Sequence, residues 1–216
     1  MTAMQLYSFF NSSTSYRVRI ALALKGLEVD YHGVNLRAGA QRQAQYRELS
    51  PIGGVPVLVS DDGISLTQSL AIIDYLDALY PQVPLVPKEW LVRARVLEVA
   101  QLIACDIHPL NNVRVLGYLQ SVLKAGAEEK DRWYAHWVAE GLSALDALLQ
   151  RHGSGPYCFG EEPTLADCCL VPQVANAERM GCDLRAYPRV MAVYSHCQTQ
   201  PAFQRAAPGQ QPDFIH

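Results

Sequence analysis

The sequence predicts a mixed α/β domain at the N-terminus followed by an all-helical domain. Short apolar runs alternate with helical patterns over the first part of the chain, as strands and helices do in an α/β domain. Prolines at 81, 84 and 87 then interrupt the pattern, and beyond them apolar residues recur at helical spacing almost to the C-terminus. We therefore expect two domains, at residues 1–84 and 88–216.

Composition and charge limit the classes of protein to which the chain can belong. It has 216 residues, half of them hydrophobic, and a formal net charge of −3, so it is long enough to bury a core. It has no basic run and no basic amphipathic helix, so neither a nucleic-acid nor a membrane partner is expected. Because no apolar stretch reaches ~18 residues and no signal peptide is evident, we expect a cytoplasmic location.

The six cysteines are expected to be small buried hydrophobic residues in a reducing compartment, because none forms a C-x-x-C motif. Cys105 and His108 have the spacing of two metal ligands on one helix face, but two further ligands at a suitable spacing are missing, so no metal site is expected. The cysteines are Cys105, Cys158, Cys168, Cys169, Cys182 and Cys197.

The apolar pattern of the first domain predicts four strands and two main helices. In chain order they are a strand at 4–10, a helix at 15–25, a strand at 29–34, a polar helix or irregular segment at 40–49, strands at 55–59 and 64–66, and a helix at 69–80. Pro56 falls just inside the third strand, where it cannot donate to a ladder hydrogen bond. We therefore expect either an edge position for that strand or a cis peptide bond at Pro56.

The second domain is predicted to contain helices only. They lie at about 92–107, 110–124, 128–151, 164–180 and 188–199, with a break at Gly153–Pro156 and an extended tail from Pro208. Pro109 is expected to end or kink the first of them. Thr164 and Asp167 have the spacing of a capping box, so Asp167 is expected to be structural.

Four hydroxyl residues, Ser12–Ser15, lie between the first strand and the first helix. They provide N-cap candidates where backbone N–H groups lack partners. Because a helix N-terminus carries partial positive charge, the same position suits an anion or a thiolate. Taken alone, the cluster also fits an ordinary N-cap.

Several stretches together resemble the glutathione transferase superfamily. Gly53–Leu58 and Thr67–Ile72 resemble motifs of the superfamily fold, and Ser12–Ile20 resembles the signature of its zeta class, which includes maleylacetoacetate and maleylpyruvate isomerases. Asp106–Asn112 and Leu170–Arg179 strengthen the resemblance to that class. It implies a thioredoxin-like N-terminal domain before the all-α domain, glutathione as coenzyme, and a homodimer.

The resemblance also implies roles for individual residues. The hydroxyls would stabilise the glutathione thiolate, the Val55 backbone would pair with the cysteinyl part beside cis-Pro56, and Gln68 with Ser69 would hold the γ-glutamyl carboxylate. The catalytic set is Ser12, Ser13 and Thr14, and the glutathione-binding set is Ser12, Thr14, Gln41, Val55, Pro56, Gln68, Ser69, His108 and Asn112. The substrate-binding set is Asn11, His108, Asn112, Arg114 and Arg179, with the arginines as clamps for carboxylates.

Two positions depart from the family pattern. Thr14 stands where many members have cysteine, and Asn11 stands where both kinds of isomerase commonly have arginine. Asparagine can hydrogen-bond to a carboxylate but brings no charge to it. Arg17 and Arg19 are expected to form ion pairs between domains or subunits rather than to bind ligands.

The function that the resemblance implies is glutathione-dependent cis–trans isomerisation of maleylacetoacetate to fumarylacetoacetate, in the catabolism of aromatic amino acids. The missing charge at Asn11 favours this substrate, because maleylpyruvate is shorter and its second carboxylate lies closer to the reacting bond. Three alternatives remain open: a maleylpyruvate isomerase of gentisate degradation, a glutathione transferase or dehalogenase acting on small α-halo acids, and a non-enzymatic interaction module.

Overall fold

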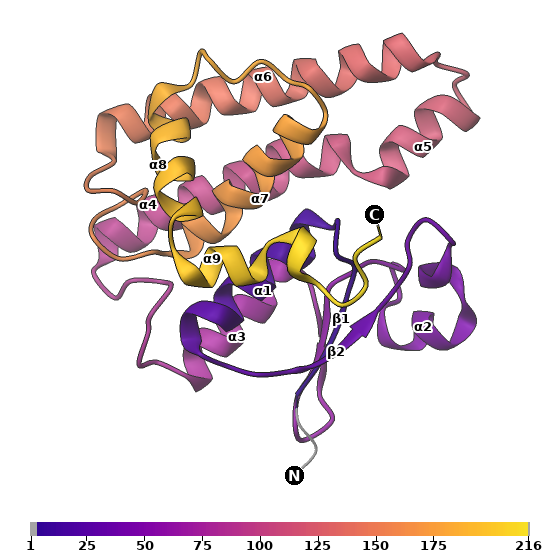
Figure 1. Ribbon diagram of the computed structural model, residues 1–216, viewed down its shortest axis with the longest axis horizontal. Helices are drawn as coiled ribbons and strands as arrows, with labels where there is room; N and C mark the ends of the chain where they lie inside the picture. Colours follow the sequence, from indigo (N-terminus) through magenta and orange to yellow (C-terminus); the bar gives the residue numbers. More distant parts are fainter. Residues whose placement is uncertain (1–3, 216) are drawn as a thin grey trace. The chain divides into compact units, whose positions relative to one another are not determined.

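The computed structural model describes residues 4–215, which form two compact units (Figure 1). One unit takes the chain as far as Val86 and again from Gln198 onwards, and the other is Pro87–Cys197. The C-terminal segment thus returns to the unit in which the chain begins.

The first unit contains a mixed four-stranded sheet. Its strands are β1 (Gln5–Ser8), β2 (Asp30–Gly33), β3 (Val57–Val59) and β4 (Ser65–Thr67), in the order β2-β1-β3-β4. β1 pairs with β2 in parallel, whereas the pairs β1–β3 and β3–β4 are antiparallel. This is the predicted thioredoxin-like arrangement.

The two main helices of this unit cover hydrophobic residues. α1 (Ser13–Lys25) makes the crossover that parallel strands β1 and β2 require, and α3 (Ser69–Leu79) packs on α1, β3 and β4. Val18, Ile20 and Ile72 are among the residues that they bury completely. The polar segment between β2 and β3 forms a 3-10 turn, Ala40–Arg42, and a short helix, α2 (Ala44–Leu49).

The second unit is helical, as predicted. Its elements are α4 (Trp90–Gln101), a π-helix η2 (Leu102–Ile107), a 3-10 helix η3 (His108–Asn111), α5 (Val113–Ser121), α6 (Ala127–His152), α7 (Leu165–Arg179) and α8 (Pro188–Gln198). α4 packs on α7, and α6 packs on η2. A Cβ on Gly141 of α6 would overlap the side chain of Ile107, so glycine permits this close contact.

The sequence predicted that Pro109 ends or kinks the first long helix of this unit, and the structure shows changes of helix type ahead of it. The regular helix changes at Leu102 into the π-helix, and Pro109 lies within the following 3-10 helix. In an α-helix the proline ring would clash with the carbonyl four residues earlier, that of Cys105. The chain around Cys105 forms a π turn instead of an α turn.

The chain beyond residue 199, for which the sequence predicted only an extended tail from Pro208, contains two further elements. A helix that was not predicted, α9 (Pro201–Ala206), packs on α1, and a 3-10 turn η4 (Pro208–Gln210) follows it. Only the last described residues form an arm.

The capping box at the start of α7 was correctly predicted: the Asp167 carboxylate accepts hydrogen bonds from Thr164 N and Oγ1 and from Cys158 N. Burial raises the pKa of Asp167, and these hydrogen bonds oppose the rise.

The cysteines follow the prediction only in part. Cys158, Cys168, Cys169 and Cys197 are buried, but Cys105 is exposed and Cys182 is partly exposed.

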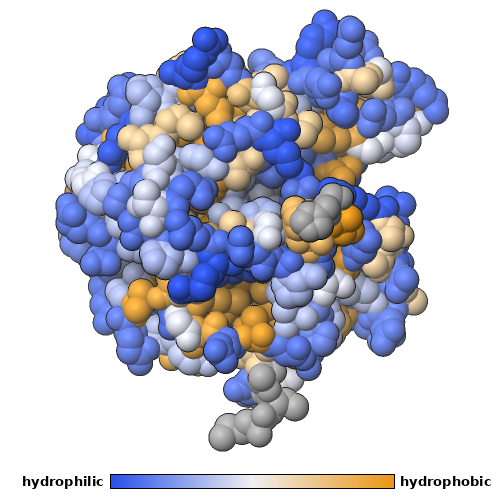
Figure 2. All heavy atoms as spheres, in the orientation of Figure 1, coloured by the Kyte–Doolittle hydropathy of each residue, from blue (hydrophilic) through white to orange (hydrophobic). Residues whose placement is uncertain are grey.

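Within residues 4–215 no three His, Cys, Asp or Glu side chains are placed to hold a metal ion. In the same range no helix has the length and hydrophobicity needed to span a membrane. Figure 2 shows small hydrophobic areas among hydrophilic residues.

Candidate functional site

The loop between β1 and α1 presents the hydroxyl cluster. Ser12 is the N-cap of α1, and its Oγ accepts a hydrogen bond from Ser15 N at 3.2 Å. Thr14 Oγ1 lies 2.9 Å from Ser12 Oγ and donates to the carbonyl of Val55 at 2.9 Å. Because the single hydroxyl proton of Thr14 is used in that bond, Ser12 is the donor in the Ser12–Thr14 pair. The Ser12 proton is therefore the one that a ligand can redirect.

A hollow of about 270 Å³, open to solvent, lies beside Thr14. Five of the predicted glutathione residues line it: Thr14, Val55, Pro56, Gln68 and Ser69. The Val55–Pro56 peptide is cis, and Pro56 directly precedes β3, so the cis alternative of the prediction is correct. Ser12 and Ser13 are not lining residues, and Ser13 is buried at the start of α1.

Four lining residues were not predicted: Ser50, Ile52, Gly54 and Thr67. Ser50 Oγ donates to Gly54 O and accepts from Gly54 N, which closes the loop that leads to Val55. Ser50-Pro51, with glycine at 53 and 54, is a turn signal that would have pointed to this loop.

The N-terminus of α3 forms one end of the hollow and suits an anion. Gln68, its N-cap, has φ +70° and ψ 113°, a conformation rare for a residue with a side chain, and makes no side-chain capping hydrogen bond. The first turn of α3 contains no acidic residue. Its N–H groups therefore remain available to a ligand at the positive end of the helix dipole.

A buried cation lies behind this end. Arg17 is only 2% exposed, and its Nη1 lies 3.4 Å from Ser69 Oγ, to which it donates. Its Nε and Nη2 atoms have no hydrogen-bond partner among residues 4–215. Because a buried guanidinium without an anion is costly, the position favours a ligand carboxylate. Together, Arg17, Ser69 and Gln68 form a subsite suited to a carboxylate.

Gln41 is not brought into the lining of the hollow. Its side-chain Nε2 donates to Leu36 O, and its backbone carbonyl oxygen would lie 2.9 Å from a Cβ on Gly53. The Gln41 backbone therefore lies close to Gly53, but Gln41 does not line the hollow.

The second unit holds the remaining predicted residues. Asn112 is the N-cap of α5: its Oδ1 accepts from Arg114 N at 3.1 Å, and its Nδ2 lies 3.3 Å from Nε2 of His108. α6 fixes this turn, because Trp133 Nε1 donates to the Leu110 carbonyl at 2.9 Å. His108 and Asn112 thus form one polar pair.

Arg114 and Arg179 are both exposed, on α5 and in the last turn of α7. Arg179 donates to Asn176 Oδ1 at 2.9 Å. Burial raises the pKa of Tyr134 to about 12, and the positive charge of Arg179 opposes the rise. Arg179 therefore lies close enough to Tyr134 of α6 for its charge to influence the tyrosine hydroxyl.

The ion-pair prediction is wrong for Arg19. Its guanidinium donates to four neutral oxygens of the first unit: Ser8 Oγ and the carbonyls of Phe9, Phe10 and Ala206. Burial lowers the pKa of Arg19 to about 10, and Tyr31, Tyr16 and Asp213 oppose the fall.

The chain matches known proteins over nearly its whole length. The family model "Glutathione S-transferase, N-terminal domain" matches residues 2–78, and "Glutathione S-transferase, C-terminal domain" matches residues 131–196. A probable maleylacetoacetate isomerase of Vibrio cholerae is 45% identical, covering 99% of each chain. A maleylpyruvate isomerase of a Ralstonia species is 43% identical, covering 97% of this chain and 99% of the relative. A holo structure of a bacterial zeta-class maleylpyruvate isomerase superposes with a TM-score of 0.94 at 42% identity, covering 98% and 100%.

The chain belongs to the zeta class of the glutathione transferase family. Two further solved structures of relatives support this assignment. A maleylpyruvate isomerase from Pseudomonas aeruginosa PAO1 has a TM-score of 0.86 at 54% identity, covering 98% of this chain and all of that one. A maleylacetoacetate isomerase from Methylobacterium extorquens AM1, with bound malonate and GSH, has a TM-score of 0.95 at 36% identity and the same coverage.

Within this zeta-class fold, one cation near the hydroxyl loop was missed from the sequence. Arg37, in the loop after β2, places its guanidinium carbon 5.3 Å from the centre of the Phe10 ring. Phe10 is the neighbour of Asn11, the residue that stands where arginine is common in the family. No local pattern around Arg37 indicated this contact, because it arises from the approach of two loops.

Proposed function

We propose that the protein is a glutathione-dependent cis–trans isomerase that converts maleylacetoacetate to fumarylacetoacetate. The observation that carries the proposal is the hollow beside α1 and α3. It combines hydroxyls near a helix N-terminus, the Val55 backbone at a cis-proline, and a carboxylate subsite with a buried arginine. Maleylacetoacetate isomerases from Anaeromyxobacter dehalogenans and Methylobacterium extorquens have been solved with bound GSH, the second also with malonate, a dicarboxylate.

The residues of this chain would bind, orient and ionise the coenzyme. Glutathione, when bound, supplies a thiolate whose reversible addition to the conjugated double bond permits rotation about that bond. Ser12 would donate its hydroxyl proton to the sulfur instead of to Thr14, and this hydrogen bond would stabilise the thiolate together with the positive end of α1. Thr14 holds the Val55 carbonyl, and Ser69 with Arg17, which donates to its hydroxyl, would hold the γ-glutamyl carboxylate. Orientation of the two reactants supplies the remaining catalytic effect.

The substrate carboxylates are assigned to the arginines of the second unit. We expect Arg114→Ala and Arg179→Ala each to lower kcat/KM about 10- to 100-fold, since each removes a charged hydrogen-bond donor. Glutathione affinity should change less than about twofold, because the hollow with its carboxylate subsite belongs to the other unit. Steady-state assays beside calorimetric glutathione titration measure both quantities.

Arg185→Ala is the matched control, because the Arg185 side chain is exposed and pairs only locally, with Asp183. Its kcat/KM should equal that of the wild type. Loss of glutathione affinity in step with activity in Arg114→Ala or Arg179→Ala would contradict the substrate role of that residue.

The second candidate substrate is maleylpyruvate, which the 54% identity to the Pseudomonas enzyme favours. Asn11 favours maleylacetoacetate, because an unpaired carboxylate in a pocket is costly to desolvate and maleylpyruvate needs a charge closer to the thiolate. We expect kcat/KM at saturating glutathione to be larger for maleylacetoacetate. Asn11→Arg should move the ratio about tenfold towards maleylpyruvate.

Gln43→Arg adds the same charge at an exposed position outside the hollow and should leave the ratio unchanged. A preference of the wild-type protein for maleylpyruvate of about tenfold or more would overturn the assignment of substrate. An unchanged ratio in Asn11→Arg would show that position 11 does not face the substrate.

The proposal includes a homodimer in the cytoplasm. Zeta-class membership supports the dimer, and six free cysteines fit a reducing compartment. Light scattering on the purified protein distinguishes a dimer from a monomer.

A further inference from the structure

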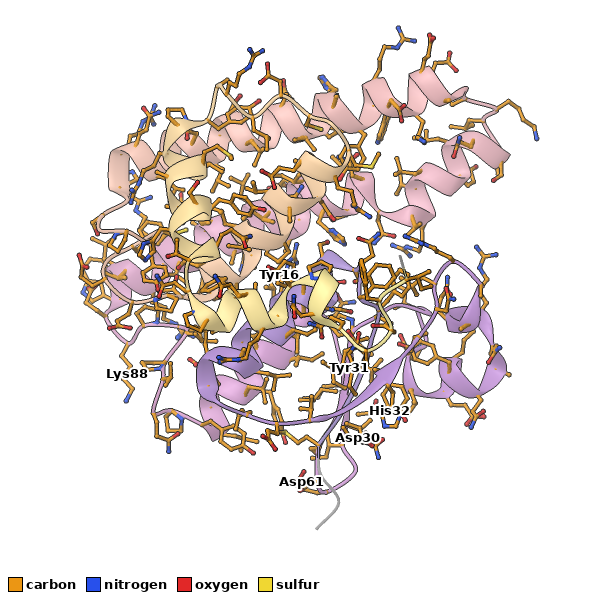
Figure 3. The ribbon with its side chains drawn as sticks, in the orientation of Figure 1. Tyr16, Asp30, Tyr31, His32, Asp61 and Lys88 are labelled. Carbon is orange, nitrogen blue, oxygen red and sulfur yellow. The ribbon has the colours of Figure 1, made fainter. Side chains whose placement is uncertain are left out.

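The last described residues of the chain lie against the loop that precedes Ser12 (Figures 1 and 3). Asp213 is the centre of this contact. Its Oδ2 accepts a hydrogen bond from the backbone N–H of Phe10 at 3.0 Å, and its Oδ1 accepts from the hydroxyl of Tyr31 at 2.7 Å. One carboxylate thus links the β1–α1 loop to β2, although it is some 200 positions from Phe10 in the sequence.

Packing supports the same position of the arm. The Phe214 ring meets the Phe10 ring edge to face, with centroids 5.3 Å apart and an interplanar angle of 87°. A Cβ on Gly33 would lie 2.9 Å from the Cβ of Asp213, so the glycine at the end of β2 provides room for the arm. The arm is therefore fitted to this surface by shape as well as by hydrogen bonds.

A second contact with the C-terminal segment holds the same loop. The Arg19 guanidinium donates to the carbonyls of Phe9 and Phe10 and also to Ala206 O at the end of α9. The loop therefore has its carbonyls fixed by Arg19 and its Phe10 N–H fixed by Asp213. Both anchors bind the loop to residues from the other end of the chain.

The loop in turn fixes Ser12. The backbone N–H of Ser12 donates to Phe9 O at 2.9 Å, and this hydrogen bond closes a turn over Phe10 and Asn11. Phe10 is buried, and Ser12 follows two residues later, so a shift of the Phe10 N–H moves the backbone from which the Ser12 hydroxyl projects. Arg37, stacked on Phe10, adds no hydrogen bond to the loop backbone.

We infer that Asp213 is a positioning residue for the Ser12 hydroxyl and thereby for the ionisation of bound glutathione. The inference rests on the proposed function, because it requires Ser12 to donate to the glutathione sulfur. Asp213 itself contacts neither coenzyme nor substrate. It acts by holding Phe10 N–H, which the β1 ladder does not engage.

Asp213→Asn tests this inference with little change of volume. The carboxylate of Asp213 accepts from Phe10 N and from the Tyr31 hydroxyl, one with each oxygen. The asparagine amide has one oxygen that accepts, and its nitrogen cannot accept from the second donor. We expect kcat to fall about tenfold and the apparent pKa of the bound thiol to rise by about half to one unit, with glutathione affinity changed less than about threefold. Asp62→Asn, in the exposed turn before β4, is the matched control and should behave as the wild type.

The decisive comparison is the double variant Ser12→Ala/Asp213→Asn. If Asp213 acts through Ser12, the thiol pKa of the double variant equals that of Ser12→Ala alone, whereas independent effects would add. Tyr31→Phe removes the other donor to Asp213 and should give a smaller shift in the same direction. It keeps the test decisive if Asp213→Asn folds poorly.

Additive shifts in the double variant, or wild-type pKa and kcat in both Asp213→Asn and Tyr31→Phe, would overturn the inference while leaving the proposed function intact. Failure of the proposed function looks different. In that case the wild-type protein itself would show neither a glutathione thiolate signal nor glutathione-dependent isomerisation, and the inference would fall with it.

Discussion

Ser12→Ala is expected to raise the apparent pKa of the bound glutathione thiol by about one to two units. A hydrogen bond to a charged group is worth about 1.5–3 kcal/mol, and one pKa unit corresponds to about 1.4 kcal/mol. Ser12 has the redirectable proton, because the Thr14 proton is already donated to Val55 O. Thiolate absorbance titrated against pH measures the shift, and kcat at neutral pH should fall in parallel.

Thr14→Val should give a smaller shift than Ser12→Ala. It removes the acceptor of the Ser12 proton and the donor to Val55 O, but no proton that is free for the sulfur. Ser121→Ala, which removes a hydroxyl bonded only within α5, is the control and should leave the curve unchanged. Unshifted curves in both Ser12→Ala and Thr14→Val would assign thiol activation to backbone groups instead.

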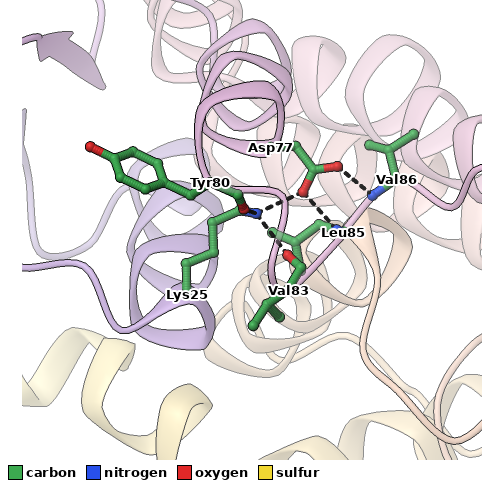
Figure 4. A network of polar contacts seen from close by, with 6 residues as sticks. All are labelled: Lys25, Asp77, Tyr80, Val83, Leu85 and Val86. Atoms are coloured by element: carbon green, nitrogen blue, oxygen red, sulfur yellow. Dashed lines mark hydrogen bonds and ion pairs between the residues drawn. The ribbon is translucent and has the colours of Figure 1, made fainter.

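Lys25→Met is expected to lower the free energy of unfolding by about 3–5 kcal/mol, the usual cost of removing one partner of a buried ion pair. The Lys25 side chain is 1% exposed, and its Nζ donates to Asp77 Oδ1 and to the carbonyls of Tyr80 and Val83 at 2.7–2.8 Å (Figure 4). The methionine leaves Asp77 with two backbone donors, Leu85 N and Val86 N, but without a cation. Urea denaturation followed by circular dichroism measures the loss.

Lys88→Met is the matched control for this change. Lys88 is exposed and extends from the connector between the units (Figure 3), so its replacement should stay within about 0.5 kcal/mol of the wild type. A Lys25→Met variant as stable as Lys88→Met would show that the network in Figure 4 contributes no net stability.

Local patterns predicted most of the elements because hydrophobic periodicity and turn residues determine them. The end of the first helix at Lys25, the capping box at Thr164 and the break at 153–156 all lie where the sequence predicted them. Short elements were less predictable: the apolar run at 4–10 contains a strand of only four residues, and α9 has no local signal beyond Pro201. The sequence predicted that Pro109 would end or kink the helix, but not that a π-helix would precede it.

In the site, too, local motifs predicted some residues, whereas contacts between remote segments were not predictable. Thr14, Pro56 and Ser69 were predictable because family motifs surround them, and the structure places them around one hollow. Arg37 and Asp213 could not be predicted, because each acts on the Ser12 loop from a segment remote in sequence. Arg19 was misjudged for a physical reason: a buried guanidinium can be satisfied by backbone carbonyls without a carboxylate.

The fate of glutathione during turnover tests the central claim most directly. Product and total glutathione are measured together, with glutathione supplied at a small fraction of the substrate concentration. The account predicts that maleylacetoacetate is isomerised completely, that omission of glutathione abolishes turnover, and that no glutathione is consumed. Consumption of one glutathione per turnover, or full activity without it, would contradict the account.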